Sequence, residues 1–349
     1  MAPRTVQPST DEDLPEVPRH LDPRVPNVES MSQAAHRPEA RTSGRIVDRV
    51  REAAVTPAFL VGKMLLKDRP EPSRDVWTES SRLWMPANRE IEISVVMPAY
   101  NPGDALRPAV DRCVDVMRAE GIGFELIVVS DGSTDGSMAT LEGAGPEVRI
   151  IELPANRGKG GALHAGFSRA RGSWVGFVDS DGDIDPAHLV DYLKVGRETG
   201  ADMVYANKKH RDSISASSPF RKVISLGFSS LVDALFSLGV NDTQTGCKLL
   251  RREVLADVLP RLRETRFAFD LELFVAASTA GYTTAVAAPV ELKERMAGST
   301  VSSSTITRTL KDALVVLARR RGTSTYRESS RPQAQVYTRG VGSAGRPTP

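Results

Sequence analysis

Between residues 91 and 206, short apolar runs alternate with segments in which apolar residues recur at helical spacing. The apolar runs have the length and composition of β-strands. They cover residues 93–97, 124–129, 148–153, 174–178 and 201–206. The first segment between them predicts a helix that ends at about Glu120. The later segments predict helices over residues 133–141, 160–171 and 188–199. This alternation predicts an α/β fold with a mostly parallel central sheet and helices on both faces.

The regions on either side of this core lack the alternation. Residues 1–45 and 323–349 are rich in proline, arginine and serine and have little apolar periodicity. We expect both ends to be disordered, because they cannot bury enough apolar surface to offset the loss of chain entropy. Residues 46–90 predict an amphipathic segment and a linker, residues 91–300 the folded domain, and residues 301–322 a C-terminal amphipathic helix.

Composition excludes several classes of protein. Apolar residues make up 40% and charged residues 26% of the chain, and the net charge of +2 argues against a nucleic-acid partner. Cys113 and Cys247 are too few for a disulfide framework or a structural zinc site, so we expect buried thiols. No apolar stretch approaches the roughly 20 residues of a membrane span, and no signal-peptide pattern opens the chain. We therefore expect a cytoplasmic protein, either free or bound peripherally at the cytoplasmic membrane face.

Three carboxylates directly follow the predicted strand at residues 174–178. Asp179, Asp181 and Asp183 occupy alternate positions, so in an extended segment their side chains point the same way. Their mutual repulsion favours a bound cation, and a hard divalent ion such as Mg²⁺ or Mn²⁺ suits oxygen ligands. The alternative is a solvated acidic turn in which Asp183 or Asp185 caps the next helix.

Two further candidate segments come directly after predicted strands. Asp131 lies at a strand end, where its carboxylate is able to accept hydrogen bonds from a base or a ribose. Ser133 or Thr134 just beyond it would cap the next helix. In residues 156–161, glycines allow close approach to a ligand, and Lys159 lies just before a helix, an arrangement that binds anions. The alternatives are a purely structural cap and a tight loop without a ligand.

Charged residues also mark the second half of the chain. Basic clusters at residues 208–211 and 221–222 flank a serine-rich segment, and they would either hold a phosphate group or form a solvated loop. Asp270 and Glu272 fall within an apolar stretch, where a buried carboxylate needs a partner or has a catalytic role.

Four segments, in order along the chain, resemble glycosyltransferase family 2, whose members are inverting enzymes of GT-A fold. They are VVMPAYN from Val95, SDGSTDGS from Ser130, NRGKGGAL from Asn156 and FVDSDGD from Phe177. The resemblance extends from about residue 93 to residue 295. Two later segments, DTQTGCKLLRREV from Asp242 and RFAFDLEL from Arg266, resemble dolichyl-phosphate glucosyltransferases, with the dolichyl-phosphate mannose synthases as near relatives.

This resemblance implies roles for particular residues. The donor, a nucleotide sugar, would contact Pro98, Ala99, Tyr100, Asp131, Lys159, Asp179 and Gln244. A Mg²⁺ or Mn²⁺ ion would bind Asp179, Asp181 and Asp183. The acceptor phosphate would bind Arg211, Arg221 and Ser225, although Lys208 and Lys209 replace a Gly-Ser-Arg-type segment of the relatives. The catalytic residues would be Asp270 and Asp181.

The resemblance implies inverting transfer of a hexose, with glucose from UDP-glucose favoured, to a lipid phosphate acceptor such as dolichyl or another polyprenyl phosphate. One alternative is a GDP-mannose-dependent synthase of the same kind. Another is transfer to a soluble or cell-wall hydroxyl, for which Asp270 would take up the proton. A third is a nucleotide-sugar binding module without catalysis.

Contact with a lipid acceptor would be peripheral. Residues 45–66 predict a helix interrupted at Pro57, and residues 309–321 combine apolar and basic side chains. Such helices bind anionic membranes. The alternative, that both segments are helices that pack against the rest of the protein, fits their sequences equally well.

Overall fold

The computed structural model describes residues 44–67, 69, 85–215, 219–240, 242–266, 268–293, 303–322 and 325–326. Most of the two ends expected to be disordered, and most of the expected linker, lie outside the described residues. Those parts of the predicted domain division therefore stay predictions. Within the two ends, Gly44 and Arg45 begin a helix and Tyr326 is fully buried, so the expected disorder is wrong at these residues.

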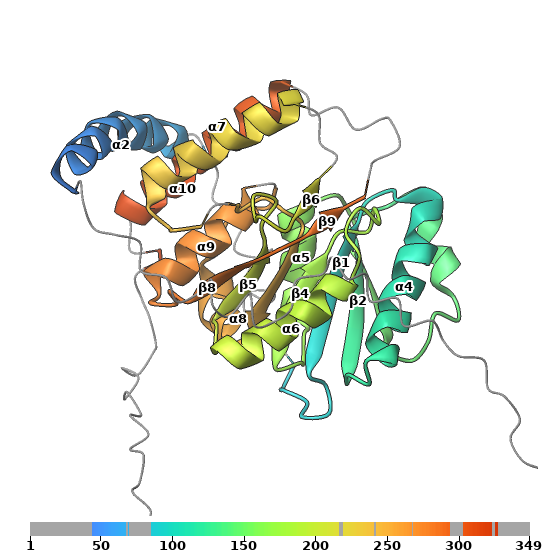
Figure 1. Cartoon of the computed structure of the whole chain (residues 1–349). Helices are drawn as coiled ribbons and strands as arrows, with labels where there is room; N and C mark the ends of the chain where they lie inside the picture. The colour runs from blue at the N-terminus through green and yellow to red at the C-terminus, as the bar shows by residue number, and fades with distance from the viewer. Residues whose placement is uncertain are drawn as a thin grey trace, which may run out of the picture.

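A central sheet of seven strands forms within the described residues, in the order β3-β2-β1-β4-β7-β5-β8 (Figure 1). Its strands are β1 (Ile93–Ala99), β2 (Phe124–Ser130), β3 (Val148–Glu152), β4 (Trp174–Val178), β5 (Met203–Ala206), β7 (Cys247–Arg251) and β8 (Ala285–Ala288). All run parallel except β7, which is antiparallel to both β4 and β5. A small second sheet pairs β6 (Ile214–Ser215) with β9 (Glu291–Leu292). The predicted α/β fold with a mostly parallel sheet is confirmed.

Three strands of the sheet differ from the sequence pattern. The pattern does not predict β8, and it does not predict β7, because Lys248 interrupts the apolar run of β7. β1 extends through Pro98, where the pattern ends the strand. β1 pairs with β4 only as far as Val96 and beyond that with β2 alone. Pro98, which has no N–H group, therefore lies beyond the part of β1 that pairs with β4.

Helices cover both faces of the sheet (Figure 1). One face carries α4 (Leu106–Ala119) and α6 (Ala187–Thr199), and the other carries α5 (Lys159–Phe167), α8 (Arg252–Val258) and α9 (Phe269–Thr279). The short 3-10 helices are η1 (Gly103–Ala105), η2 (Ser137–Leu141) and η3 (Leu259–Arg261). Alternate side chains of β1 enter the two cores, Val95 and Met97 on the side of α4 and Val96 on the side of α5.

Three helices form a further layer beyond α9, namely α2 (Gly44–Lys67), α7 (Pro219–Phe236) and α10 (Ser303–Gly322) (Figure 1). The predicted interruption at Pro57 is wrong, since α2 continues through it. Packing maintains this helix: Val55 is buried, and a side chain at Gly62 would collide with the Leu314 carbonyl of α10. Leu317 of α10 is also buried, which supports the packing alternative for this helix. No helix in the described part of the chain is long and apolar enough to cross a bilayer.

The helix predicted over residues 133–141 is reduced to η2. Ser133 and Thr134 do not cap it, because they bind Asn101 in the loop after β1. The Asn101 N–H donates to Ser133 Oγ (3.1 Å), and the Thr134 N–H donates to Asn101 Oδ1 (2.8 Å). Asp135 accepts hydrogen bonds from the N–H and the hydroxyl of Ser137, and such local bonds compete with helix formation. The result is a firm connection between the loops that come after β1 and β2.

Candidate active site

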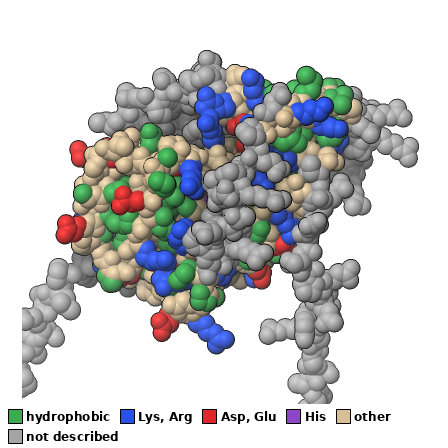
Figure 2. All heavy atoms as spheres, turned by 180° about the vertical axis from the view of Figure 1, so that it is seen from behind, with side chains coloured by type: hydrophobic (Ala, Val, Ile, Leu, Met, Phe, Trp, Pro, Cys, Tyr) green, Lys and Arg blue, Asp and Glu red, His purple; other side chains and the backbone are tan. Residues whose placement is uncertain are grey.

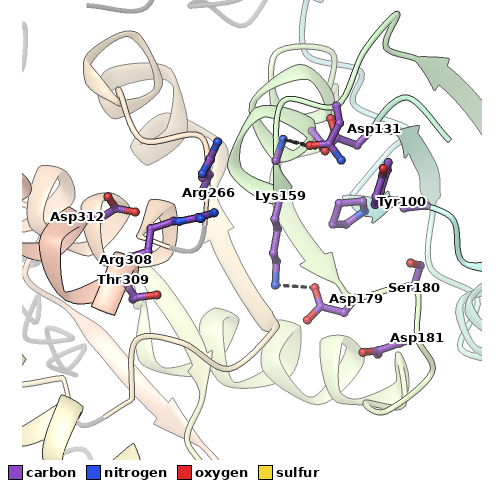
Figure 3. A pocket seen from close by; sticks show the side chains of 15 residues that line it. Tyr100, Asp131, Lys159, Asp179, Ser180, Asp181, Arg266, Arg308, Thr309 and Asp312 are labelled. Atoms are coloured by element: carbon purple, nitrogen blue, oxygen red, sulfur yellow. Dashed lines mark hydrogen bonds and ion pairs between the residues drawn. The ribbon is translucent and has the colours of Figure 1, made fainter. Parts of the chain in front are cut away.

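The carboxyl ends of β1, β2 and β4 open onto a cavity of about 540 Å³ (Figure 3). Ligands of parallel sheets bind at such ends. Of the residues predicted from the sequence, the cavity lining contains Pro98, Ala99, Tyr100, Asp131, Lys159, Asp179 and Asp181. The other residues that line it are Asn156, Gly158, Ala162, Ser180, Arg266, Arg308, Thr309 and Asp312.

Asp131 holds the loop before α5 against the end of β2. Its two carboxylate oxygens accept the backbone N–H groups of Arg157 (2.7 Å) and Gly158 (2.8 Å). Burial raises the pKa of Asp131, and these two hydrogen bonds oppose the rise. Gly158 has a φ of 87°, and a side chain there would meet the Thr265 carbonyl, so glycine is required for this close approach.

Lys159 and Asp179 form an ion pair across the cavity floor. Lys159 Nζ lies 2.6 Å from Asp179 Oδ1, and the two side chains are 18% and 31% exposed. On the other side of Asp179, Gly246 lies so close that a Cβ atom there would overlap the carboxylate. The position of Asp179 is therefore fixed both by its charge partner and by the absence of a side chain at residue 246.

The charges at this point shift one another. Burial by itself would lower the pKa of Lys159, but Asp179, Asp270 and Asp181 outweigh it, and the pKa is raised. Burial raises the pKa of Asp179, with Lys159 opposing and Asp181 adding to the rise. Lys159 therefore keeps its positive charge near neutral pH, where it is able to face an anionic ligand.

The three carboxylates predicted as metal ligands are not equivalent in the fold. Asp179 and Asp181 line the cavity, whereas Asp183 does not. Among the described residues, no group of three or more acidic, histidine or cysteine side chains is arranged to hold a metal ion. Asp185 caps α6, as the alternative interpretation of this turn predicts, because its Oδ1 accepts the N–H of Ala187 at the start of the helix (3.0 Å).

Asp270 lies outside the cavity lining. Its Oδ1 accepts a hydrogen bond from Lys248 Nζ at 2.7 Å, and both side chains are almost fully buried. Lys248 Nζ also donates to the Thr245 carbonyl (2.7 Å) and lies 5.0 Å from the centroid of the Phe177 ring. Lys159 Nζ lies 5.3 Å from the same centroid. The buried pair of Lys248 and Asp270 is thus one aromatic ring away from Lys159.

The remaining predicted residues are either outside the cavity lining or not described at the side chain. Gln244 is not part of the cavity lining. Arg211 is 74% exposed, and its Nε donates to the carboxylate of the adjacent Asp212 at 3.2 Å. Arg221 and Ser225 belong to α7, and their side chains are outside the described part of the chain. Their roles in binding the acceptor stay predictions.

One wall of the cavity is missing from the sequence prediction. It consists of Arg266, Arg308, Thr309 and Asp312. Arg266 opens the segment RFAFDLEL, which carries a family resemblance, so that segment contained a signal for it. The other three reach the cavity only because α10 packs beside α9, and no local pattern indicates this packing.

Comparison with known proteins agrees with this architecture. Residues 94–259 match the family model described as Glycosyl transferase family 2. Dolichyl-phosphate beta-glucosyltransferase of Drosophila melanogaster is 34% identical over 200 residues, which cover 52% of this chain and 61% of that protein. The Homo sapiens protein of the same name is 33% identical over 199 residues, with coverage of 52% and 61%. The chain thus spans 61% of the length of these two relatives.

Solved structures show the same fold. Glucosyl-3-phosphoglycerate synthase of Mycobacterium tuberculosis, in complex with Mn²⁺, UDP-glucose and phosphoglyceric acid, has a TM-score of 0.51 at 17% identity, covering 73% of this chain and 86% of that one. Its complex with phosphoglyceric acid has a TM-score of 0.51 at 20% identity, covering 67% and 81%. The predicted GT-A fold is confirmed. Residues 94–259 therefore match glycosyltransferase family 2, in a chain that is similar to the dolichyl-phosphate beta-glucosyltransferases.

Proposed function

We propose that this protein is an inverting glycosyltransferase that transfers glucose from UDP-glucose to a polyprenyl phosphate such as dolichyl phosphate. The observation that carries the proposal is the single cavity in which Tyr100 and Asp131 lie beside the ion pair of Lys159 and Asp179. The similarity to dolichyl-phosphate beta-glucosyltransferases supports the sugar and the acceptor. UDP-glucose is bound by the solved neighbour of the same fold, which supports the donor.

The walls of the cavity suit a nucleoside diphosphate. Tyr100 is 54% exposed, so its ring offers a face on which a base is able to stack. Asp131 uses its two oxygens for two backbone N–H groups, and a carboxylate has lone pairs left to accept a bond from a ribose hydroxyl. Lys159, at the first turn of α5, would contact the diphosphate.

The oxygen ligands at the cavity fit a divalent cation. Mg²⁺ usually binds one or two carboxylates and completes its coordination with water and substrate phosphates. Asp179 and Asp181 supply two carboxylates at the cavity, so a preformed cluster of three is not required. These two residues would hold Mg²⁺ or Mn²⁺, and the ion would offset charge on the leaving diphosphate.

The proposed reaction is a single displacement at the anomeric carbon. An oxygen of the acceptor phosphate forms the new bond, the bond to UDP breaks with its electron pair leaving on UDP, and the configuration inverts. Lys159, held protonated by its acidic neighbours, stabilises the charge that develops on the diphosphate. A phosphate monoester has a second pKa of about 6, so it is ionised at neutral pH and needs no strong base.

In this mechanism Asp270 does not act as a base. Its role is to position the Lys248 side chain, whose Nζ donates to it. Transfer to a hydroxyl would instead require a base, which is the role that the family resemblance gives Asp270. Asp270→Asn should therefore retain more transfer to polyprenyl phosphate than to a hydroxyl acceptor, measured as kcat/KM for each. An equal and complete loss on the phosphate acceptor would contradict the positioning role.

Transfer of labelled glucose from UDP-glucose to polyprenyl phosphate tests the proposed function. We expect a metal-dependent lipid product of inverted anomeric configuration, and a loss of about 100-fold or more in Asp181→Ala. A parallel reaction with GDP-mannose tests the alternative donor, and product from that donor alone would refute UDP-glucose. Hydrolysis of UDP-glucose that needs Asp181, without any lipid product, would refute the acceptor while retaining the donor site.

We further propose that α2 brings the protein to the membrane surface. Leu60, Val61 and Met64 are 57%, 46% and 71% exposed, and Lys63 and Lys67 are exposed on the same helix. Figure 2 shows hydrophobic side chains beside basic ones on this part of the surface. Exposed apolar side chains beside basic ones favour binding to anionic bilayers.

Flotation with liposomes tests this contact. Binding to anionic but not neutral liposomes is expected, and the double variant Leu60→Ser, Met64→Ser should lose it while remaining folded by circular dichroism. Absence of binding by the unmodified protein would refute the contact.

A further inference from the structure

Two arginines line the wall of the cavity that the sequence does not predict. Arg266 lies just before α9, and Arg308 lies on α10. Figure 3 shows the Arg308 side chain extending from α10 into the cavity, toward the side where Lys159 lies. Neither guanidinium group has a hydrogen bond or an ion pair with another residue in the part of the chain that the structure describes.

Packed elements determine where both arginines lie. A Cβ atom at Gly158 would lie 3.1 Å from Arg266 Cγ, so the Arg266 stem runs along the loop that leads to Lys159. The neighbouring Thr265 carbonyl accepts the N–H of Gly161 (3.0 Å), which ties the two loops together. Arg266 is therefore held beside the loop that would contact the donor diphosphate.

Arg308 is positioned by the attachment of α10. Asp312, one turn further along the helix, is ion-paired with Arg69. Closer to the end of the helix, Arg319 Nη1 lies 2.7 Å from the Glu264 carboxylate, and Arg69 Nη1 lies 2.8 Å from the same carboxylate. These buried or half-buried ion pairs hold α10 against the segment that carries Arg266.

The carboxylates of the cavity do not neutralise these arginines. Asp312 is paired with Arg69, Asp179 with Lys159, and Asp131 accepts two backbone N–H groups. Asp181, the fourth carboxylate of the lining, lies on the side of Asp179, away from both arginines (Figure 3). Both guanidinium groups line one cavity, and an anion bound there would pair with both of them. The planar guanidinium matches the oxygens of a phosphate group with two parallel hydrogen bonds.

We infer that Arg266 and Arg308 bind the phosphate group of the acceptor, an inference that rests on the proposed function. In a single displacement, the attacking oxygen approaches the anomeric carbon from the side opposite the leaving group. The leaving diphosphate belongs with Lys159, Asp179 and Asp181, and Figure 3 shows the two arginines across the cavity from the two carboxylates. The acceptor phosphate would then be bound within the cavity itself, whereas Arg211 lies outside its lining.

This assignment also defines the class of acceptor. Two permanent positive charges at the position of the nucleophile favour a dianionic phosphate monoester over a neutral alcohol, because only the phosphate forms ion pairs with both arginines. Selection of a phosphorylated acceptor thus comes from α10 and the segment before α9.

Steady-state kinetics of four single variants and one double variant test the inference. Arg266→Gln, Arg308→Gln and their combination should raise the KM for polyprenyl phosphate in detergent micelles, by about 10- to 100-fold for each arginine. The KM for UDP-glucose should change by less than about twofold. Arg321→Gln, an exposed arginine at the other end of the same helix, is the matched control and should leave both constants unchanged. Arg211→Gln tests the rival assignment, and the inference expects its acceptor KM to rise less than that of either cavity variant.

Three outcomes would overturn the inference. The first is an unchanged acceptor KM in the double variant, and the second is an equal rise in the donor KM, which would assign the arginines to the diphosphate. The third is a rise in the acceptor KM for Arg211→Gln without one for the two cavity arginines.

A binding measurement separates this inference from the reaction itself. Calorimetric titration of the UDP-loaded protein with a short-chain prenyl phosphate should give binding that the double variant loses. Such a result would support the arginine site even if the unmodified protein transferred no glucose. Equal binding by the unmodified protein and the double variant would refute the site even if transfer occurred.

Discussion

The substitution Gly246→Ala tests how strictly the position of the Asp179 carboxylate is fixed. A Cβ atom at Gly246 would overlap the Asp179 carboxylate, whereas one at Gly227 on α7 has no atom within 4 Å. Gly246→Ala should displace the carboxylate and raise the KM for UDP-glucose by about tenfold or more, and Gly227→Ala should leave it unchanged. Circular dichroism would verify that both variants fold. An unchanged KM in Gly246→Ala would mean that donor binding does not depend on the position of Asp179.

The buried imidazole of His164 makes stability depend on pH. Burial lowers its pKa to about 3, from an ordinary value of 6.5. Between these values the unfolded chain binds a proton that the folded chain does not, so the free energy of unfolding decreases as the pH falls. The slope contributed by this residue is at most about 1.4 kcal/mol per pH unit, and it vanishes above the unfolded pKa.

His164→Gln should remove this contribution. Glutamine does not titrate, and its amide is able to replace the contact of His164 Nε2 with the Leu259 carbonyl (3.3 Å). Urea unfolding at about pH 7.5 and about pH 5 should show a smaller loss of stability on acidification in the variant. Equal losses in the two proteins would exclude His164 as the titrating group.

At the level of single residues, the sequence predicts the side chains that lie just beyond the ends of parallel strands. Asp131 and Asp179 are found together because β2 and β4 end at the same edge of the sheet. Arg308 is unpredictable by this route, since only the packing of a distant helix brings it there. Asp270 is the opposite case. It belongs to a recognisable segment and was predicted to be catalytic, yet it lies buried beside Lys248, outside the cavity lining.

Among the elements, α9 and α10 are joined by a buried ionic network that we expect to be essential for stability. Arg319 Nη1 lies 2.7 Å from Glu264 and 3.3 Å from Glu272, and the Tyr326 hydroxyl donates to Glu272 at 2.5 Å. Arg319→Met would leave two buried carboxylates without this cation. Breaking a buried pair in this way lowers the free energy of unfolding by about 3–5 kcal/mol.

Denaturant unfolding measures this effect, with Arg321→Met as the control. Arg321 is exposed at the end of the same helix, so its replacement should change the free energy of unfolding by less than about 0.5 kcal/mol. Similar values for the two variants would mean that the attachment of α10 rests on its apolar contacts. A selective loss in Arg319→Met would show that the network holds the helix that carries Arg308.

The elements themselves were predictable to different degrees. The strands β1 to β5 are predicted from apolar runs, because a strand covered on both faces must be apolar at nearly every position. β7 was not predicted, because its buried Lys248 looks like a surface residue until Asp270 is known to face it. α2 is continuous because its partner α10 compensates for Pro57, and a local rule about proline does not contain that information.

For the molecule as a whole, the cavity lies between two parts, and one of them is easier to predict from the sequence than the other. The sheet and its loops supply the side proposed to bind the donor, and the family resemblance covers them. On the other side, α10 supplies Arg308, Thr309 and Asp312. The place of α10 in the helical layer beside α9 depends on contacts between residues far apart in the chain (Figure 1). Under the proposed function, variation in α10 would change the acceptor while the donor side stays the same.

Ligand binding should stabilise the whole molecule in a way that depends on Asp181. A ligand at about 100 times its dissociation constant adds about 2.7 kcal/mol to the free energy of unfolding. For a domain of this size that corresponds to a rise in Tm of about 5 °C or more. UDP with Mn²⁺ should produce this rise in the unmodified protein, and UDP with a chelator should produce much less.

Two variants separate the carboxylates within the same thermal unfolding experiment. Asp181→Ala should lose most of the rise, because Asp181 lines the cavity. Asp183→Ala should keep most of it, since Asp183 lies outside the cavity lining. A full rise in Asp181→Ala would contradict the proposed cation site. Loss of the rise in Asp183→Ala would restore the third ligand that the sequence pattern predicts, and it would mean that the loop after β4 rearranges when the nucleotide and the ion bind.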